Sequence, residues 1–301
     1  MSNLKKAKNF YLNFLKQQKI KGEPFYDKIG QLNKFYLPIC ENIFKDHVKS
    51  KKIRVIGLSG GQGSGKSTIT QIIKIILEKL HGLRVVFFSM DDFYKTLNER
   101  KKMSKKLHKL FLTRGVPGTH DVKLLYLVLN SLKKKYFKPV LIPRFDKSTD
   151  DREPRSKWTL VKKRPDIIIF EGWCVGARHQ SKQGLIKPIN TLEKKYDKKL
   201  VWRNKVNNEL KKNYSKIFKK INHLIFLKVP NFKSVYKWRL LQETKLSLTK
   251  KNKKTMNSTQ IKKFIMHYER ITKQMIKDLN KKANTVLCLD TKHRLTKIKF
   301  N

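Results

Sequence analysis

A glycine-rich octapeptide at residues 60–67 is the feature that most constrains what this chain can fold into. It reads Gly60-Gly-Gln-Gly-Ser-Gly-Lys-Ser67 and matches the phosphate-binding pattern G-x-x-x-x-G-K-[S/T] at every fixed position. An apolar run at 53–58 precedes it, and isoleucines and leucines at helical spacing follow it over 66–80. A glycine-rich turn that arose by chance would not require an apolar run before it or a helical pattern after it. The sequence therefore predicts a strand, a phosphate loop and a helix in succession.

The residues of this loop predict ATP and Mg²⁺ as cofactors. Glycines allow successive backbone N–H groups to point at phosphate oxygens, and the helix N-terminus adds partial positive charge. Lys66 is expected to contact the β- and γ-phosphates, and the Ser67 hydroxyl to bind Mg²⁺. The predicted ATP-binding residues are Gly60, Gly61, Gln62, Gly63, Ser64, Gly65, Lys66, Ser67 and Thr68. The chain lacks the guanine-reading N-K-x-D, which argues against a GTPase, and its length of 301 residues suits a small-molecule kinase.

Apolar runs alternate with helical patterns along most of the chain. The predicted strands are 53–58, 84–89, 140–143, 166–170, 224–228 and 285–289, and the predicted helices lie near 66–80, 121–134, 190–212, 231–249 and 258–280. This alternation indicates an α/β fold with a doubly wound, mainly parallel sheet, the P-loop NTPase (kinase) fold. Helical spacing at 2–19 and about 31–49 predicts a helical N-terminal region, 1–50, before a kinase domain, 51–301. The polar segment 249–255 is expected to be flexible.

The formal net charge of +50 raises the question of a nucleic-acid partner. Only 13 of the 72 basic residues are arginine, and the lysines spread over the whole length instead of clustering with aromatic residues. This distribution favours a solvated lysine surface, so no specific nucleic acid is expected. A nucleic-acid-binding ATPase stays an alternative, and it predicts ATP turnover stimulated by RNA or DNA at physiological salt.

Cysteine spacing and hydropathy bear on the compartment. The three cysteines, Cys40, Cys174 and Cys288, are far apart and form no CxxC or Cys/His cluster, so neither disulfides nor a zinc site is expected. The N-terminus lacks a signal-peptide apolar core, and no apolar run approaches the ~18 residues of a membrane span. The sequence thus predicts a cytoplasmic protein without a membrane partner, and it leaves the oligomeric state open.

Acidic residues follow two of the predicted strands, in a chain that has few acids. Asp91 and Asp92 come just after 84–89, and Glu171 closes 166–170 in a pattern like Walker B. Because the carboxyl ends of parallel strands open onto the ligand crevice, these acids are expected to face Mg²⁺ and the γ-phosphate. Asp91 is the predicted base, and Ser67, Asp92 and Glu171 are the predicted metal ligands. The alternatives are a strand-end turn for the aspartates and a water-exposed strand end for Glu171.

Several further motifs lie between the strands. They read S-M-D-D-F-Y at 89–94, R-G-V-P-G-T-H-D at 114–121, P-R-F-D-K-S at 143–148 and F-E-G-W at 170–173. Together with 235–243, 256–264 and 286–290, this set resembles the D-glycerate 3-kinase family of the phosphoribulokinase/uridine kinase/pantothenate kinase group, over roughly 30–295. The resemblance implies phosphorylation of D-glycerate to 3-phospho-D-glycerate. A nucleoside, pantothenate or another sugar acid stays open as the acceptor.

The resemblance also suggests functional residues. A small hydroxy acid needs fixed cations and donors, and arginine alone offers a planar fork for a carboxylate. The predicted substrate-binding residues are Asp91, Tyr94, Arg114, His120, Arg144 and Lys147, and the predicted catalytic residues are Lys66, Asp91, Arg152 and Arg239. The alternative for Arg239 is an i,i+4 partner of Glu243. Two departures from the family put contacts in question: residues 149–152 lack glycine, and Ala177 stands where an aromatic is common.

Overall fold

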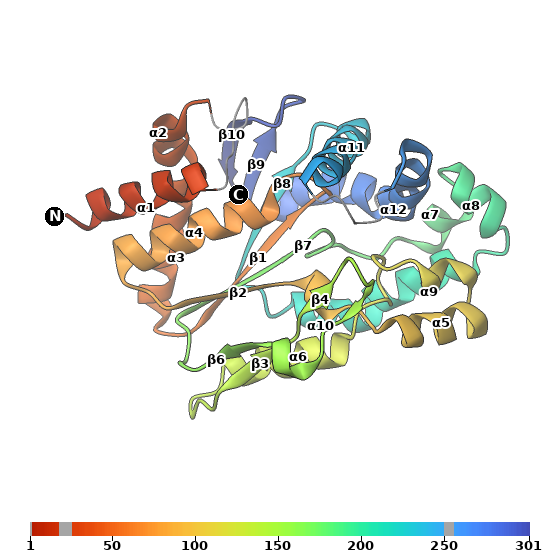
Figure 1. The fold of residues 1–301 in the computed structure, drawn as a ribbon, viewed down its shortest axis with the longest axis horizontal. Coiled ribbons are helices and arrows are strands. Elements are labelled where there is room, and N and C mark those ends of the chain that lie inside the picture. The colour runs from red at the N-terminus through yellow and green to blue at the C-terminus, as the bar shows by residue number, and fades with distance from the viewer. Residues whose placement is uncertain (1, 18–25, 250–255) are drawn as a thin grey trace.

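A six-stranded sheet forms the centre of the molecule, in a computed structural model that describes residues 2–17, 26–249 and 256–301 (Figure 1). The strand order is β10-β9-β8-β1-β7-β2, and every neighbouring pair is parallel except β9 and β10. The strands are β1 (Arg54–Gly60), β2 (Val85–Ser89), β7 (Ile167–Gly172), β8 (His223–Lys228), β9 (Thr285–Leu289) and β10 (Leu295–Phe300). The predicted α/β class and mainly parallel sheet are confirmed, and β10 is an antiparallel edge strand that the sequence did not predict.

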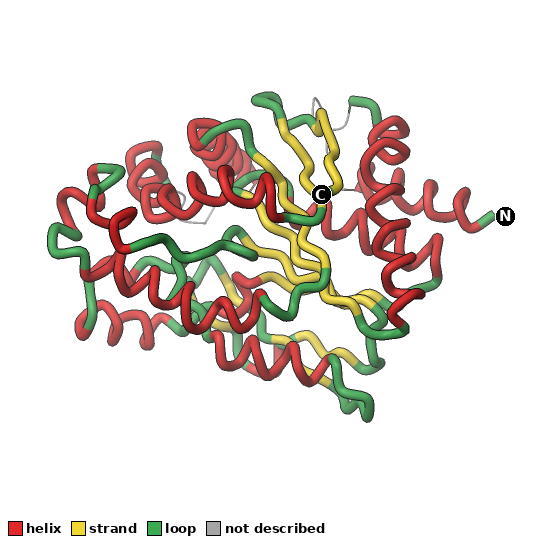
Figure 2. Tube along the Cα trace, turned by 180° about the vertical axis from the view of Figure 1, so that it is seen from behind, coloured by secondary structure: helices red, strands yellow, loops and turns green. Residues whose placement is uncertain are grey.

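Helices cover both faces of this sheet, as the view from behind also shows (Figure 2). One core takes up side chains of α1 (Asn3–Gln17), the turn η2 (Leu32–Tyr36), α3 (Leu37–Ser50), α4 (Lys66–His81) and α11 (Phe232–Thr249). The other takes up side chains of α6 (Val122–Leu132), α9 (Val201–Glu209), η6 (Leu210–Tyr214), α10 (Ser215–Phe218) and α12 (Ser258–Lys282). Along β7, Ile167 and Ile169 enter the first core while Ile168 and Phe170 enter the second. A strand buried on both faces explains why its sequence is a continuous apolar run.

The remaining elements lie between these, and several of them carry site residues. The short helices and turns are α2 (Lys28–Gln31), η3 (Met90–Phe93), α5 (Leu97–Lys106), η4 (Lys109–Leu112), η5 (Arg155–Lys157), α7 (Lys182–Ile186) and α8 (Thr191–Tyr196). The short strands are β3 (Val140–Ile142), β4 (Phe145–Asp146), β5 (Asp151–Arg152) and β6 (Thr159–Val161).

Two sequence predictions need correction. The run 140–143 does not join the central sheet: β3 pairs antiparallel with β6 in a separate two-stranded sheet. Prolines at positions 139 and 143 flank the three apolar residues, and proline cannot donate to a central ladder. The helix predicted over 190–212 is two helices, α8 and α9, because Leu200 adopts a left-handed φ of 62° and the Asp197 carboxylate accepts the N–H groups of Trp202 and Arg203.

The N-terminal helices pack against α4, and their buried side chains join the core on that side of the sheet. Tyr11 and Leu15 of α1 are fully buried in the same core as β1 and α4, and the Tyr11 hydroxyl donates to the Lys28 carbonyl at 2.9 Å. The segment 249–255, for which flexibility was predicted, lies outside the described residues beyond Thr249. No helix in the described ranges combines the length and the apolarity that crossing a membrane requires.

A buried ion network fixes α12 against α8 and α9. Glu193 of α8 accepts two hydrogen bonds from Arg270 of α12, at 2.8 and 2.6 Å, and lies 3.6 Å from Arg203 of α9. Arg203 also donates to Asp197 at 2.9 Å. Glu193 is 1% exposed. Removing its charge would leave the Arg270 guanidinium buried without a carboxylate, whereas Arg203 would keep Asp197.

We expect Glu193→Ala to lower the free energy of unfolding by about 3–5 kcal/mol, the range for breaking a buried ion pair from one side. Urea unfolding followed by circular dichroism measures this change. The matched control is Glu78→Ala, which removes a half-buried i,i+4 partner of Lys74 within α4. That pair is worth about 0.5 kcal/mol or less. Equal losses in the two variants would show that the network does not stabilise the fold.

Candidate active site

The phosphate loop lies between the C-terminal end of β1 and the start of α4, and its glycines are sterically required. Gly63 and Gly65 adopt φ values of 74° and 86°, which side chains rarely tolerate. A Cβ at Gly60 would lie 2.8 Å from Ser64 Oγ, and one at Gly63 would lie 2.9 Å from Trp238 Cβ. The loop is therefore packed tightly under α11, with the N-terminal turn of α4 at its end. This is the strand, loop and helix that the sequence predicted.

Lys66 lies near the end of this loop, within reach of the charges of Glu171 in β7 and of Asp91 in the turn η3 after β2. Its Nζ donates to the Gly61 carbonyl at 3.0 Å. Burial lowers the pKa of Lys66, and the charges of Glu171 and Asp91 act in the opposite direction. The ends of β1, β7 and β2 thus bring a loop lysine and two acids into one electrostatic cluster.

The predicted metal ligands differ in the hydrogen bonds that they already make. The Ser67 hydroxyl donates to Glu171 Oε1 at 3.2 Å, and Glu171 is 6% exposed. Burial raises the pKa of Glu171, while the Lys66 ammonium opposes this. Asp92 instead accepts the Ser89 N–H at 3.2 Å in the capping box of η3, and burial raises its pKa to about 6.

This donor set suits Mg²⁺ in part. No cluster of three or more His, Cys, Asp or Glu side chains suited to a metal occurs in the described ranges. Mg²⁺ bound with a nucleotide needs only one or two carboxylates in addition to phosphate oxygens and water. Ser67 and Glu171 are adjacent and meet that requirement, whereas Asp92 would first have to release its capping bond.

Asp91 accepts a hydrogen bond on each of its two carboxylate oxygens. The Tyr94 hydroxyl donates to Oδ1 at 2.9 Å, and Lys147 Nζ donates to Oδ2 at 2.6 Å. Burial alone raises the pKa of Asp91, but Lys147, with help from Lys66, outweighs it and holds that pKa well below its usual range. The carboxylate is therefore ionised and oriented at neutral pH.

Four of the predicted substrate residues lie around Asp91. The His120 ring stacks on the Tyr94 ring at 4.4 Å between centroids, and Phe145 packs edge-on against Tyr94 at 5.2 Å. Arg114 forms an ion pair with Asp150 and lies over the Phe145 ring. Tyr94, Arg114, His120 and Lys147 are thus brought together with Asp91.

The remaining predicted arginines lie in different surroundings. Arg152 donates to the Tyr94 carbonyl at 2.8 Å and lies 3.4 Å from Asp121. Arg239 pairs with Glu243 at 2.6 Å, which is the helical pair that the sequence left open, and its guanidinium lies over the Phe264 ring. Arg144 is exposed, and its charge acts on Asp92. The roles predicted for these three arginines stay predictions.

Several residues of the site were not predicted from the sequence. Asp150 binds both Arg114 and the fully buried Arg100. Tyr268 of α12 donates to the Arg114 carbonyl at 2.9 Å, and Tyr214 contacts His120 Nδ1 at 2.7 Å. The two tyrosines are 154 and 94 residues from their partners, so local spacing gave no signal for them. For Asp150 a signal was present, since it lies in the loop that departs from the family pattern.

Comparisons with known proteins find related kinases. The model of the Phosphoribulokinase / Uridine kinase family matches residues 55–183. The "Uncharacterized kinase mug58" of Schizosaccharomyces pombe is 36% identical over 222 residues, 71% of this chain and 78% of that protein. "D-glycerate 3-kinase, chloroplastic" of Arabidopsis thaliana is 28% identical over 257 residues, 79% of this chain and 53% of that protein. The solved structure of D-glycerate 3-kinase from Cryptococcus neoformans superposes with a TM-score of 0.73 at 23% identity, over 88% of this chain and 97% of that one, which supports the fold.

The neutral state of His120 predicts how stability depends on pH. Burial lowers its pKa to about 3, against an ordinary value of about 6.5. The unfolded chain therefore takes up a proton below pH 6.5 that the folded protein binds only near pH 3, and stability is lost as pH falls through this window. Between pH 7 and pH 5 we expect the free energy of unfolding to fall by about 2 kcal/mol more in the wild type than in His120→Gln. Urea unfolding at both pH values tests this, and equal losses would contradict it.

Proposed function

The chain belongs to the Phosphoribulokinase / Uridine kinase family, and we propose that it transfers the γ-phosphoryl group of ATP to a hydroxyl of a small hydroxy acid, D-glycerate being the first candidate. The family and the phosphate loop make the chain a P-loop kinase. The identity of the acceptor is the proposal. It is supported by the Arabidopsis thaliana relative named D-glycerate 3-kinase and by the cations beside Asp91.

One observation carries this proposal: the Asp91 carboxylate is fixed by Lys147 and Tyr94 within the field of the phosphate-loop lysine. An acceptor hydroxyl bound to Asp91 would lie next to the phosphate-binding loop. Phosphoryl transfer depends mainly on such positioning and on neutralising charge. Because the pKa of Asp91 is held low, Asp91 orients the hydroxyl and accepts its proton late, as the bond to phosphorus forms.

The cations of the site have donors to spare for a carboxylate. Lys147 uses one of its three N–H donors on Asp91, and Arg114 uses Nη1 on Asp150. Their remaining donors can bind the acid group of the acceptor while Asp91 holds its hydroxyl. A nucleoside would instead need an exposed aromatic surface for its base, and the aromatic rings nearest Asp91 are packed against one another.

Different residues would bind the nucleotide and the acceptor in the transfer. Lys66 would bind phosphate oxygens, and Ser67 with Glu171 would hold Mg²⁺, which supplies positive charge to the transferring group. Arg152 would act through Tyr94, whose carbonyl it binds. Arg239 would reach the phosphates only after releasing Glu243.

The first test is to identify the product. We expect purified protein with ATP, Mg²⁺ and D-glycerate to give 3-phospho-D-glycerate, identified by mass and by phosphorus NMR. Parallel reactions with uridine, pantothenate and another sugar acid serve as controls. Turnover with one of those acceptors and none with D-glycerate would refute the proposed acceptor and leave the kinase assignment in place.

Two substitutions test the chemistry. Lys66→Ala and Asp91→Asn should each lower kcat/KM by at least about 10²-fold, because they remove charge that is organised for the transition state. Melting curves and circular dichroism control for folding. The control variant Lys79→Ala, in α4 where the ammonium lies over the Phe10 ring of α1, should keep wild-type kinetics. Near-normal turnover of Asp91→Asn would remove Asp91 from its proposed role.

A further inference from the structure

His120 carries a buried nitrogen that has no partner. The side chain is 1% exposed and stacks on Tyr94, whose hydroxyl donates to Asp91. Its Nδ1 contacts the Tyr214 hydroxyl at 2.7 Å, whereas Nε2 makes no hydrogen bond to any of the described residues. A buried polar atom without a hydrogen-bond partner destabilises the folded protein. The unpaired Nε2 next to Tyr94 and Asp91 therefore suggests that a ligand supplies its partner.

The contacts of Tyr214 decide which nitrogen carries the proton. The Tyr214 oxygen already accepts the Gly118 N–H at 2.9 Å. Among the described residues, His120 Nδ1 is the one acceptor within hydrogen-bond distance to which the Tyr214 hydroxyl can donate its proton. Burial raises the pKa of Tyr214 well above its ordinary value, which keeps that proton on the oxygen. With Nδ1 accepting, a neutral His120 must carry its proton on Nε2.

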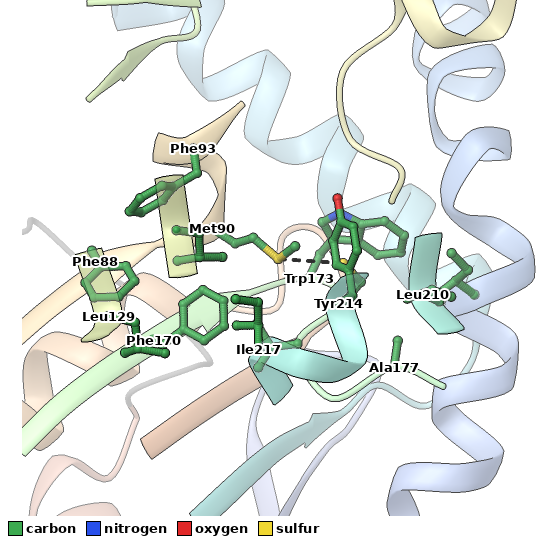
Figure 3. Close-up of a cluster of buried hydrophobic side chains, with 14 of the residues drawn as sticks. Phe88, Met90, Phe93, Leu129, Phe170, Trp173, Ala177, Leu210, Tyr214 and Ile217 are labelled. Carbon is green, nitrogen blue, oxygen red and sulfur yellow. Dashed lines mark hydrogen bonds between the residues drawn. The ribbon is translucent and has the colours of Figure 1, made fainter. Parts of the chain in front are cut away.

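The surroundings of Tyr214 are suited to holding it in place. It is 1% exposed, and it ends the π-helical turn η6 at Leu210–Tyr214, a type of turn that is frequent at functional sites. Figure 3 shows Tyr214 in a buried apolar cluster with Trp173, Met90 and Ile217. Burial among these side chains holds the Tyr214 ring where its hydroxyl reaches His120 Nδ1.

We propose that Tyr214 is a positioning residue that holds His120 as the neutral Nε2–H tautomer, so that His120 presents one fixed donor to an oxygen of the phosphoryl acceptor. The contact with the acceptor rests on the proposed function, whereas the tautomer is a property of the free protein. A donor fixed in this way would favour a hydroxyl or carboxylate oxygen at that position, because such an oxygen can accept a hydrogen bond. It would disfavour a group that can only donate one.

Nitrogen-15 NMR of protein labelled at histidine tests the tautomer directly. We expect His120, assigned by its loss in His120→Gln, to show an unprotonated Nδ1 and a protonated Nε2 in the free protein at pH 7. Tyr214→Phe should give a mixture of tautomers, and the matched control Tyr136→Phe, at an exposed tyrosine, should not change the signals. A protonated Nδ1 in the wild type would overturn the proposal, even if Tyr214→Phe did not fold.

Adding D-glycerate with ADP and Mg²⁺ tests the contact to the acceptor. We expect binding, measured by calorimetry, to shift the His120 Nε2 signal. D-glycerate that binds without shifting it would overturn the contact. Failure of D-glycerate to bind at all would refute the proposed acceptor, and the free-protein spectrum would still decide the tautomer.

Kinetics separate a fixed donor from simple packing. Tyr214→Phe should raise KM for D-glycerate about tenfold, the effect of one hydrogen bond, and KM for ATP should stay unchanged. In His120→Gln the amide nitrogen occupies the position of Nε2, whereas in His120→Asn it occupies the position of Nδ1. Because the proposed donor is Nε2, His120→Gln should retain more activity than His120→Asn. Equal activity of the two variants, both folded, would contradict a donor at Nε2.

Discussion

The attraction between two carboxylates and two ammonium groups at the C-terminal edge of the sheet is the interaction on which this site depends. Asp91 and Glu171 would repel each other, and burial raises the pKa of both. The positive charges of Lys66 and Lys147 lower the pKa of both carboxyl groups and so favour their ionised forms. Such charges act more strongly away from bulk water, so a small shift of any one of them changes the others. A charged phosphate that binds here would meet an already ordered set of partners.

The sheet brings these charges together through strand order and register. β7 lies between β1 and β2, and Glu171 is aligned with Leu58 on one side and with Ser89 on the other. Asp91 follows two residues after Ser89, and the phosphate loop follows directly after β1. Because all three strands run parallel, their carboxyl ends meet at one edge. A slip by one residue in β7 would turn Glu171 to the opposite face of the sheet.

The sequence predicted the parts of this site that local patterns encode. The phosphate loop, the continuous apolar strands and the acids at their ends each have a spacing that follows from backbone geometry. It did not predict contacts made across the fold, such as those of Tyr214 with His120 or of Tyr268 with the Arg114 carbonyl. It also assigned β3 to the central sheet, because a short apolar run does not specify which strand will pair with it.

The shortened loop at 149–152 shows how a departure from a family pattern can be compensated. Glycine is common where the backbone needs a positive φ, and here Asp150 adopts a φ of 58° instead. Aspartate is among the few residues that enter this region at modest cost, and its carboxylate adds something glycine lacks. It pairs with Arg114 and with the buried Arg100, while its carbonyl accepts Arg100 Nη2. Asp150 thus fixes the arginine proposed to bind the acceptor carboxylate, and Asp150→Gly would remove that support.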